Sequence, residues 1–227
     1  MLYFKQTHFG KEVFPMTEII NRIQELGVIP VIKLDRAEDA VPLAKALRDG
    51  GLKAAEVTFR TDAAEEAIRL IAKEFPDFLL IAGTVLTTLQ ADKAMKAGAQ
   101  AIVSPGLNPA VVKYCRDKGY PIVPGVVTPT EVESAMSFGL THVKFFPAEA
   151  AGGVKMISAM SAPYGNIRFM PTGGIGPKNL AEYLKCKAVF ACGGSWMVPS
   201  DKIAAGDFDA IREMTAEAVA LVKEIRK

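Results

Sequence analysis

The stretch from residue 79 to residue 107, LLIAGTVLTTLQADKAMKAGAQAIVSPGL, contains two apolar runs separated by one amphipathic segment. The runs Leu79–Val85 and Ala101–Leu107 have the length and composition of buried β-strands. Between them, Leu89–Ala97 carries apolar residues at helical spacing, and Gly98 follows, as is common just past a helix. The stretch therefore predicts a strand–helix–strand unit with parallel strands.

The same alternation of strands and helices extends along the chain on both sides of this unit. The other predicted strands are Val28–Leu34, Ala54–Phe59, Pro121–Val127, His142–Ala148, Arg168–Gly174 and Val189–Met197. The other predicted helices are Ala37–Arg48, Ala63–Phe75, Pro109–Lys118, Glu131–Phe138, Pro177–Lys185 and Phe208–Ile225. We also expect an extra helix over Thr17–Leu26, ahead of the first strand, with Thr17 as its cap and Gly27 past its end.

Strands that are apolar along nearly their whole length, each followed by a helix, predict an α/β fold with a parallel sheet. We predict a closed (β/α)₈ TIM barrel with an extra N-terminal helix. An open doubly wound sheet is the alternative, but the first strand, VIPVIKLDR (28–36), is not followed by the GxGxxG turn expected there. Without a linker or low-complexity segment, residues 1–227 are expected to form a single domain, with 1–16 as an N-terminal extension.

Composition excludes several classes of function. The formal net charge of +2 and the absence of a basic cluster argue against nucleic-acid binding. The three cysteines, without a CxxC pair, argue against a disulfide framework or a zinc site and favour a reducing cytoplasm. No apolar run reaches the length of a membrane span, and no signal peptide is recognisable. We therefore expect a cytoplasmic protein without a metal or a membrane association.

In a TIM barrel, the active site lies at the carboxyl ends of the strands. Polar side chains late in the predicted strands, or just after them, are therefore the candidate functional residues. They are Lys33, Glu56, Thr58, Arg60, Thr84, Ser104, Thr128, Lys144, Thr172 and Ser195.

Lys144 is the first candidate for a catalytic residue. It lies in the predicted strand HVKFFPA, flanked by Val143, Phe145 and Phe146. Alternate residues of a barrel strand point inward, so Lys144 is expected among apolar side chains. Burial disfavours the ammonium form, and a neutral amine can attack a ketone and form an imine. The alternative is a lysine that reaches outward and pairs with an acid.

Glu56, in the predicted strand AAEVTF, is the candidate partner of Lys144. A buried glutamate is rare unless it is paired or functional, and cleavage of a carbon–carbon bond beside a hydroxyl needs a general acid/base. A structural ion pair with Lys144 is compatible with the same pattern. Lys33, at the end of the first strand, is an alternative partner or a source of positive charge for the substrate.

Two further features predict that the substrate is an anion. Arg60 follows the strand of Glu56 and can hold a carboxylate with two parallel hydrogen bonds. It can equally be a surface arginine that caps the next helix and forms ion pairs there. The glycine pairs of PTGGI (171–175) and CGGSW (192–196) close adjacent late strands, where many barrels bind phosphate through backbone N–H groups. Tight turns are the alternative explanation of these glycines. Ser195 can add a hydroxyl donor.

The segments EVTFRT, IAGTVL, SPGL, PGVVTPTE, KFFPAEAAGG, PTGGI and GGSWMVP together resemble the 2-dehydro-3-deoxy-6-phosphogluconate aldolase family, from about Val28 through the last helix. The resemblance implies a (β/α)₈ barrel, usually a homotrimer, that works in the Entner–Doudoroff pathway without a cofactor. It implies class I aldol cleavage to pyruvate and glyceraldehyde 3-phosphate, and in many members also cleavage of 4-hydroxy-2-oxoglutarate.

The resemblance also implies a role for individual residues of this chain. Lys144 corresponds to the Schiff-base lysine, and Glu56 to the general acid/base. The implied substrate-binding residues are Arg60 and Thr84 for the carboxylate, Pro105 and Phe146 as walls around the imine, and Gly173, Gly174, Gly194 and Ser195 for the phosphate. The Arg60–Thr61 pair resembles the phosphogluconate-type branch more than the galactonate-type branch. The Ile81–Ala82 pair before Gly83 and the N-terminal extension depart from the family pattern away from this chemistry.

Two other functions remain compatible with the sequence. A phosphate-binding barrel isomerase or epimerase would also carry two late glycine loops, but it would form no imine. A non-catalytic barrel that senses a sugar phosphate would bind its ligand without turnover.

Overall fold

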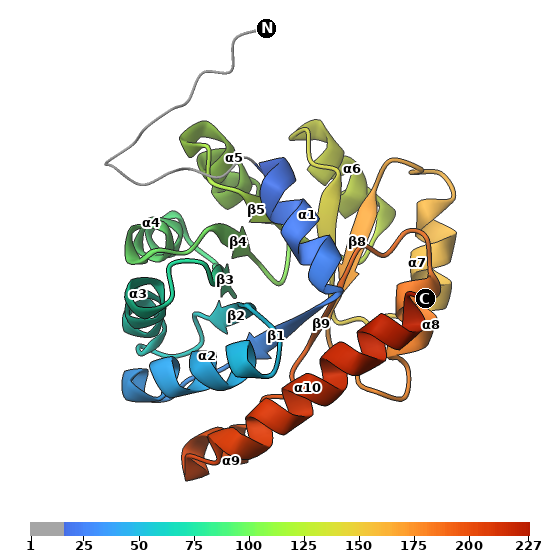
Figure 1. The fold of residues 1–227 in the computed structure, drawn as a ribbon. Helices are drawn as coiled ribbons and strands as arrows, with labels where there is room; N and C mark the ends of the chain where they lie inside the picture. The colour runs from blue at the N-terminus through green and yellow to red at the C-terminus, as the bar shows by residue number, and fades with distance from the viewer. Residues whose placement is uncertain (1–15) are drawn as a thin grey trace, which may run out of the picture.

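The computed structural model describes residues 16–227 of the 227-residue chain, and strands and helices alternate along it (Figure 1). The strands are β1 (Val28–Ile32), β2 (Ala54–Thr58), β3 (Leu79–Gly83), β4 (Ala101–Val103), β5 (Ile122–Val123), β6 (Gly125–Val126), β7 (His142–Phe145), β8 (Arg168–Pro171) and β9 (Cys192–Gly194). The helices are α1 (Met16–Leu26), α2 (Ala40–Asp49), α3 (Ala64–Glu74), α4 (Thr88–Ala97), α5 (Pro109–Lys118), α6 (Pro129–Ser137), α7 (Gly153–Ser161), α8 (Leu180–Lys185), α9 (Ser200–Ala205) and α10 (Phe208–Ile225), with a 3₁₀ turn at Ala37–Asp39.

All paired strands are parallel. One sheet has the order β5-β4-β3-β2-β1-β9, and the other has the order β6-β7-β8. A single residue, Pro124, separates β5 from β6, and its carbonyl accepts a hydrogen bond from the Lys144 N–H at 2.9 Å. Isolated parallel bridges join Phe169 to Val189 and Thr172 to Gly193, next to β8 and β9. The predicted α/β class with a parallel sheet is confirmed.

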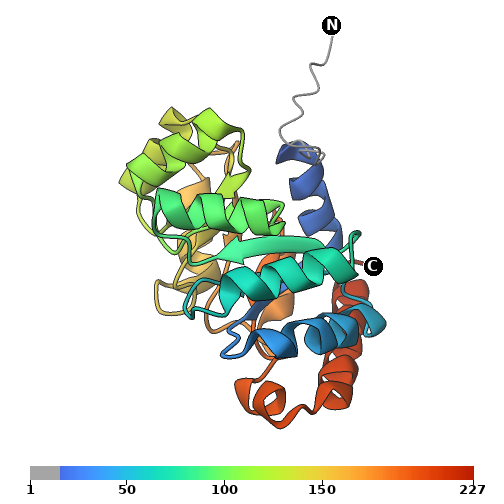
Figure 2. The same ribbon diagram turned by 90° about the vertical axis from the view of Figure 1, so that its left-hand side faces the viewer.

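The strands have two buried faces, because alternate side chains belong to two different apolar clusters. In β2 and β3, Ala54, Leu79 and Ile81 contribute to an inner cluster, whereas Ala55 and Leu80 contribute to the outer cluster under the helices. Figure 1 shows the helices arranged around the strands, and Figure 2 shows α3 and α4 side by side on the outside. The period of two along each strand therefore decides which polar residues face the interior.

Helix α1 covers the amino ends of the strands. Its buried residues Ile19, Ile20 and Ile23 join the inner cluster, together with Leu79 and Ala101, the first residues of β3 and β4. In Figure 1 this helix lies in front of the strands. Because α1 covers the amino ends of the strands, the carboxyl ends are the end at which the sequence predicts the site.

Several predicted strands end earlier in the structure. Predicted strand 101–107 ends at Val103, 142–148 ends at Phe145, and 189–197 is reduced to Cys192–Gly194. The residues after these strands form loops at their carboxyl ends, and residues 189–191 lie before β9. Predicted strand 121–127 is interrupted because Pro124 has no N–H to donate to a neighbouring strand.

The helix predictions need four corrections. The extra N-terminal helix is present, but it begins at Met16, so the predicted cap Thr17 lies inside it. The predicted helix 177–185 begins only at Leu180, and α7 and α9 were not predicted. The sequence gives little helix signal at the start of α7 because two glycines, Gly152 and Gly153, stand there. In the structure both have positive φ. The predicted extension 1–16 lies, except for Met16, outside the described residues.

The other helix boundaries follow ordinary capping. Thr87 and Asn108 cap α4 and α5, and Thr128 forms a capping box with Glu131 at α6. Thr128 therefore has a structural role, although its position had made it a site candidate. Among residues 16–227, no helix combines the length and apolar character needed to cross a membrane.

Candidate active site

The centre of the site is an ion pair between Lys144 on β7 and Glu56 on β2. The Lys144 Nζ lies 3.0 Å from Glu56 Oε1, and the two residues are only 5% and 0% exposed. Both occupy inward positions, since Val57 and Val143 beside them belong to the outer cluster. Desolvating two charges costs several kcal/mol per ion, so a buried pair is weak evidence for stability. Its position among apolar residues favours a chemical role.

Gly83 makes the room for the Glu56 carboxylate. It pairs with Thr58 in the register of β2 and β3, and a Cβ at this position would lie 2.6 Å from Glu56 Cγ. Such a contact is shorter than real Cβ contacts, so any larger residue would displace Glu56. Sequence reasoning missed this role, although a glycine on the strand next to a buried acid is a usable signal.

Three predicted substrate-binding residues are linked to Lys144, one directly and two through a neighbouring residue. The Phe146 ring centroid is 5.4 Å from Lys144 Nζ, within the range of a cation–π contact. Phe146 also lies 3.6 Å from the position of a Cβ on Gly173. The Pro105 carbonyl lies directly against Gly125, and Gly125 pairs with Lys144 in the β6–β7 register. The structure therefore places Phe146 at the lysine, Gly173 beside Phe146, and Pro105 beside the strand neighbour of the lysine, Gly125.

Thr84 directly follows Gly83 and has an unusual backbone conformation. Its φ of 56° lies in the left-handed region, which β-branched residues rarely adopt. Strain of this kind is found mostly at functional sites, where neighbouring structure maintains it. Here the adjacent Val85 N–H donates to the Val103 carbonyl at 3.2 Å. The strain supports the prediction that Thr84 has a function.

Arg60 lies beyond the end of β2 and is exposed. Its Nε donates to the Thr58 hydroxyl at 3.0 Å, and that hydroxyl donates to the Ile32 carbonyl at 2.7 Å. Thr58 is buried and inward, two residues past Glu56 in β2. Two residues span about 6–7 Å along a strand. Thr58 therefore holds the Arg60 guanidinium beyond the ion pair, toward the carboxyl ends of the strands.

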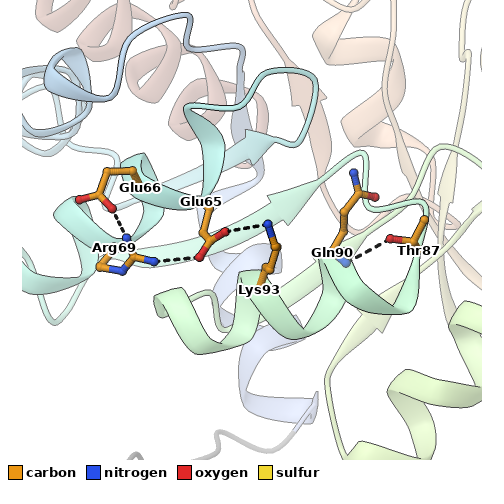
Figure 3. A network of polar contacts seen from close by, with 6 residues as sticks. All are labelled: Glu65, Glu66, Arg69, Thr87, Gln90 and Lys93. Carbon is orange, nitrogen blue, oxygen red and sulfur yellow. Dashed lines mark hydrogen bonds and ion pairs between the residues drawn. The ribbon is translucent and has the colours of Figure 1, made fainter.

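Outside the mouth, Arg60 also lines a cleft of about 230 Å³ between α3 and α4. Figure 3 shows its polar network: Glu65 on α3 pairs with Arg69 at 2.9 Å and with Lys93 on α4 at 3.4 Å. Thr87 accepts from the Gln90 N–H at 3.1 Å, and so caps α4. The pair of Glu65 with Lys93 links α3 to α4, which follow the strands β2 and β3 in the chain.

Lys33 does not pair with Glu56, so the prediction of Lys33 as an alternative partner is wrong. Lys33 is 40% exposed and lies 2.6 Å from Asp35. Lys33 follows β1, and its long side chain reaches the acid two residues further along the chain, outside the interior. Glu56 has Lys144 as its partner instead.

The two glycine loops lie next to each other. The bridge between Thr172 and Gly193 aligns Gly173 with Gly194 at the ends of β8 and β9. We call residues 173–176 the glycine loop. Gly173 and Gly174 have φ of 102° and 78°, a region that favours glycine. Ser195 follows Gly194 and is exposed, which leaves its hydroxyl accessible.

Two buried side-chain oxygens in the described chain have no hydrogen-bond partner: Glu56 Oε2 and Thr172 Oγ1. The Thr172 hydroxyl lies against Gly193, whose missing side chain leaves it space. A buried polar atom usually has a partner, so Glu56 Oε2, an acceptor, is suited to a hydroxyl group of a substrate, and the Thr172 hydroxyl to a hydroxyl or carbonyl group. Thr172 was a positional candidate in the sequence, but its part in the site was not predicted. Ser104, another candidate from its position in the sequence, donates to the Gly106 carbonyl at 2.8 Å.

Comparison with known proteins identifies this arrangement. The family model for "KDPG and KHG aldolase" matches residues 19–214. The chain belongs to the KDPG and KHG aldolase family. A curated relative within this family, 2-dehydro-3-deoxy-phosphogluconate aldolase of Treponema pallidum, is 53% identical over 207 residues, which cover 91% of this chain and 99% of that protein.

Solved structures of the KDPG aldolases agree with the fold. KDPG aldolase of Legionella pneumophila, with pyruvate captured as a covalent carbinolamine intermediate, matches with a TM-score of 0.85 and 40% identity over 88% of this chain and 97% of that one. The aldolase of Zymomonas mobilis, with 3-phosphoglycerate, matches with a TM-score of 0.85 and 38% identity over 91% and 97% of the two chains.

Proposed function

We propose that this protein is a class I aldolase that cleaves 2-dehydro-3-deoxy-6-phosphogluconate to pyruvate and glyceraldehyde 3-phosphate through an imine on Lys144. The observation that carries the proposal is the buried contact of 3.0 Å between Lys144 Nζ and Glu56 Oε1. The family match and the carbinolamine in the Legionella relative support the same chemistry. 4-Hydroxy-2-oxoglutarate, cleaved to pyruvate and glyoxylate, is the proposed second substrate.

The first steps use the ion pair. Transfer of one proton from the Lys144 ammonium group to Glu56 leaves a neutral amine, which attacks the C2 ketone of the substrate. The ketone oxygen takes the proton back from Glu56, and this gives a carbinolamine. The nitrogen of this adduct then gives one of its two protons to Glu56, which passes it to the hydroxyl group, so that water leaves and the iminium ion remains. Arg60 and Thr84 hold the neighbouring carboxylate and so orient the carbonyl for attack.

The later steps break the carbon–carbon bond. Glu56 takes the proton of the C4 hydroxyl, and its free oxygen Oε2 is available for this contact. The electron pair of the C3–C4 bond moves toward the iminium nitrogen, the aldehyde leaves, and an enamine remains. Protonation of the enamine at C3 and hydrolysis of the imine release pyruvate and restore Lys144. Pro105 and Phe146 form walls around the imine and limit the access of water.

The phosphate end of the substrate is assigned to the paired glycine loops. Gly173 and Gly174 lie beside Gly194 and Ser195, and glycines allow backbone N–H groups to approach an anion closely. The 3-phosphoglycerate in the Zymomonas relative supports a phosphorylated ligand. Binding energy from this distant group then helps to hold the reacting carbons in place.

The proposal extends to fold and assembly. We propose one closed (β/α)₈ barrel in a single domain of residues 1–227, because a single residue separates β5 from β6 and bridges connect the β8 and β9 regions. By resemblance to the family, the active form is a cytoplasmic homotrimer in the Entner–Doudoroff pathway. Light scattering of the purified protein tests the trimer.

Borohydride trapping tests the proposed chemistry. Reduction in the presence of pyruvate should attach the pyruvyl group to wild-type protein, and peptide mapping should find it on Lys144. Activity should be unaffected by a chelator. Turnover of a sugar phosphate without any trapping would instead favour the isomerase or epimerase, and phosphate binding without turnover would favour the sensor.

A further inference from the structure

The glycine loop is held from one side by two residues of the segment that follows β7. The Ala148 N–H donates to the Thr172 carbonyl at 2.8 Å, and the Glu149 N–H donates to the Gly173 carbonyl at 3.1 Å. The Glu149 side chain also lies against Gly174, because a Cβ on Gly174 would be 2.6 Å from Glu149 Cγ. The position of Glu149 therefore determines the shape of the loop.

Tyr183 on α8 determines the position of Glu149. Tyr183 is completely buried, and its hydroxyl donates a hydrogen bond to Glu149 Oε1. Gly153, at the start of α7, leaves room for this contact: a Cβ there would lie 3.2 Å from the Tyr183 hydroxyl and 3.3 Å from Glu149 Oε1. Burial and the nearby carboxylate raise the pKa of Tyr183, so its hydroxyl stays protonated at any working pH.

This contact has no place in the proposed reaction. Tyr183 contacts Glu149 through its hydroxyl, and Glu149 touches the glycine loop through its backbone N–H and its methylene groups. Because Gly173 and Gly174 have a large conformational freedom of their own, an unsupported loop would lose more entropy on binding an anion. A rigid contact made before binding reduces that cost.

We propose that Tyr183 is a positioning residue for substrate selection: through Glu149 it holds the glycine loop in the shape that binds a phosphate group, and so favours phosphorylated keto acids. This inference rests on the proposed aldolase function. It predicts an effect that depends on the substrate, because only 2-dehydro-3-deoxy-6-phosphogluconate uses the glycine loop, whereas 4-hydroxy-2-oxoglutarate has no phosphate.

The test compares Tyr183→Phe with Tyr164→Phe. Tyr164 makes a matched hydrogen bond of 2.8 Å to Glu133 on the surface, so its variant controls for the loss of a tyrosine–glutamate contact. We expect Tyr183→Phe to raise KM for the phosphorylated substrate about tenfold, the value of one hydrogen bond to a charged group. kcat, and both constants for 4-hydroxy-2-oxoglutarate, should stay near wild type.

Glu149 supplies the second pair of variants. Glu149→Met keeps the methylene packing on Gly174 but removes the acceptor, so it should reproduce the effect of Tyr183→Phe even if that variant fails to fold. Glu149→Gln keeps an acceptor oxygen and should leave KM unchanged. Inhibition by inorganic phosphate should weaken in the same two variants that raise KM.

Other results would overturn the inference. An equal loss on both substrates in Tyr183→Phe or Glu149→Met would mean that the contact only stabilises the fold, and unchanged KM for the phosphorylated substrate would remove the role altogether. A raised KM in Glu149→Gln would assign the effect to charge rather than to the hydrogen bond. Wild-type protein that fails the borohydride test would refute the aldolase proposal itself, which is a separate outcome.

Discussion

Replacing Lys144 with methionine separates the chemical role of this lysine from its structural role. Lys144 and Glu56 are 5% and 0% exposed, so the variant leaves a buried carboxylate without the partner that lies 3.0 Å away. Removing one partner of a buried pair costs about 3–5 kcal/mol. In a chain of this size, about 1 kcal/mol shifts the midpoint of thermal unfolding by about 2–4 °C, so Tm should fall by roughly 6 to 20 °C.

The double variant Lys144→Met with Glu56→Gln is the matched control. It removes both charges while conserving approximate volume, and replacing a buried pair by neutral groups is often close to neutral for stability. The double variant should therefore recover most of the lost Tm. It should remain inactive and should not be trapped by borohydride, because it has no amine at position 144.

Scanning calorimetry and intact-protein mass spectrometry after borohydride reduction measure the two effects. A Tm for Lys144→Met equal to that of wild type would show that the buried pair carries no such cost, and the estimate from burial would be wrong. Pyruvate trapped on Lys144→Met would place the imine elsewhere. We expect the single variant to lose both stability and trapping. We expect the double variant to lose only trapping.

Three other predictions follow from particular contacts. Thr58→Val removes the hydroxyl that accepts the hydrogen bond of Arg60 Nε, and so leaves Arg60 less well placed to bind the keto acid. KM for the keto acid should rise about tenfold with little change in kcat. Gly83→Ala would push the Glu56 carboxylate aside, and kcat should fall about 100-fold, as it does for a misplacement of about 1 Å. Burial, with a smaller contribution from Arg168, lowers the pKa of His142 below the ordinary value of 6.5. The unfolded chain then binds the proton more readily, so stability should fall as pH drops through that value, and His142→Gln should flatten this slope in calorimetry.

Each of these three predictions has a control variant or a result that would contradict it. Thr58→Ser keeps the hydroxyl and should restore KM, and Thr58→Val should add nothing in an Arg60→Ala background; independent effects would contradict the positioning role. Gly165→Ala, where no atom lies within 4 Å of the new Cβ, should leave kcat unchanged. Equal slopes of Tm against pH in His142→Gln and wild type would assign the acid sensitivity to other groups.

The inward or outward direction of side chains was predictable because strands have a period of two. Lys144 and Glu56 are separated by 88 positions in sequence, yet their places in two apolar strands predicted that both face the interior. Strand ends were less predictable, since residues 104–107 and 146–148, which continue the predicted strands, leave the sheet to form loops. An apolar run alone does not tell a strand from a buried loop.

Contacts between residues of separate elements were not predictable. Lys33 and Lys144 were both possible partners for Glu56, and only the three-dimensional positions distinguish them, because Lys33 reaches Asp35 instead. The role of Gly83 and the contact of Tyr183 with Glu149 depend on distances of a few ångström between separate elements. Helix α7 was missed because Gly152 and Gly153 weaken the local signal, whereas its apolar face packs on the rest of the fold.

The sequence by itself determined the alternating order of strands and helices, the inward faces of the strands, and the kinds of residue available for imine chemistry. These properties are local, since they depend on periodicity, on glycine and proline, and on the polarity of neighbours. The tertiary structure decided which amine meets which acid, which glycine makes room for it, and which buried tyrosine supports the glycine loop. Those choices arise from close packing between distant segments, where a displacement of one ångström changes a hydrogen bond into a clash or a gap.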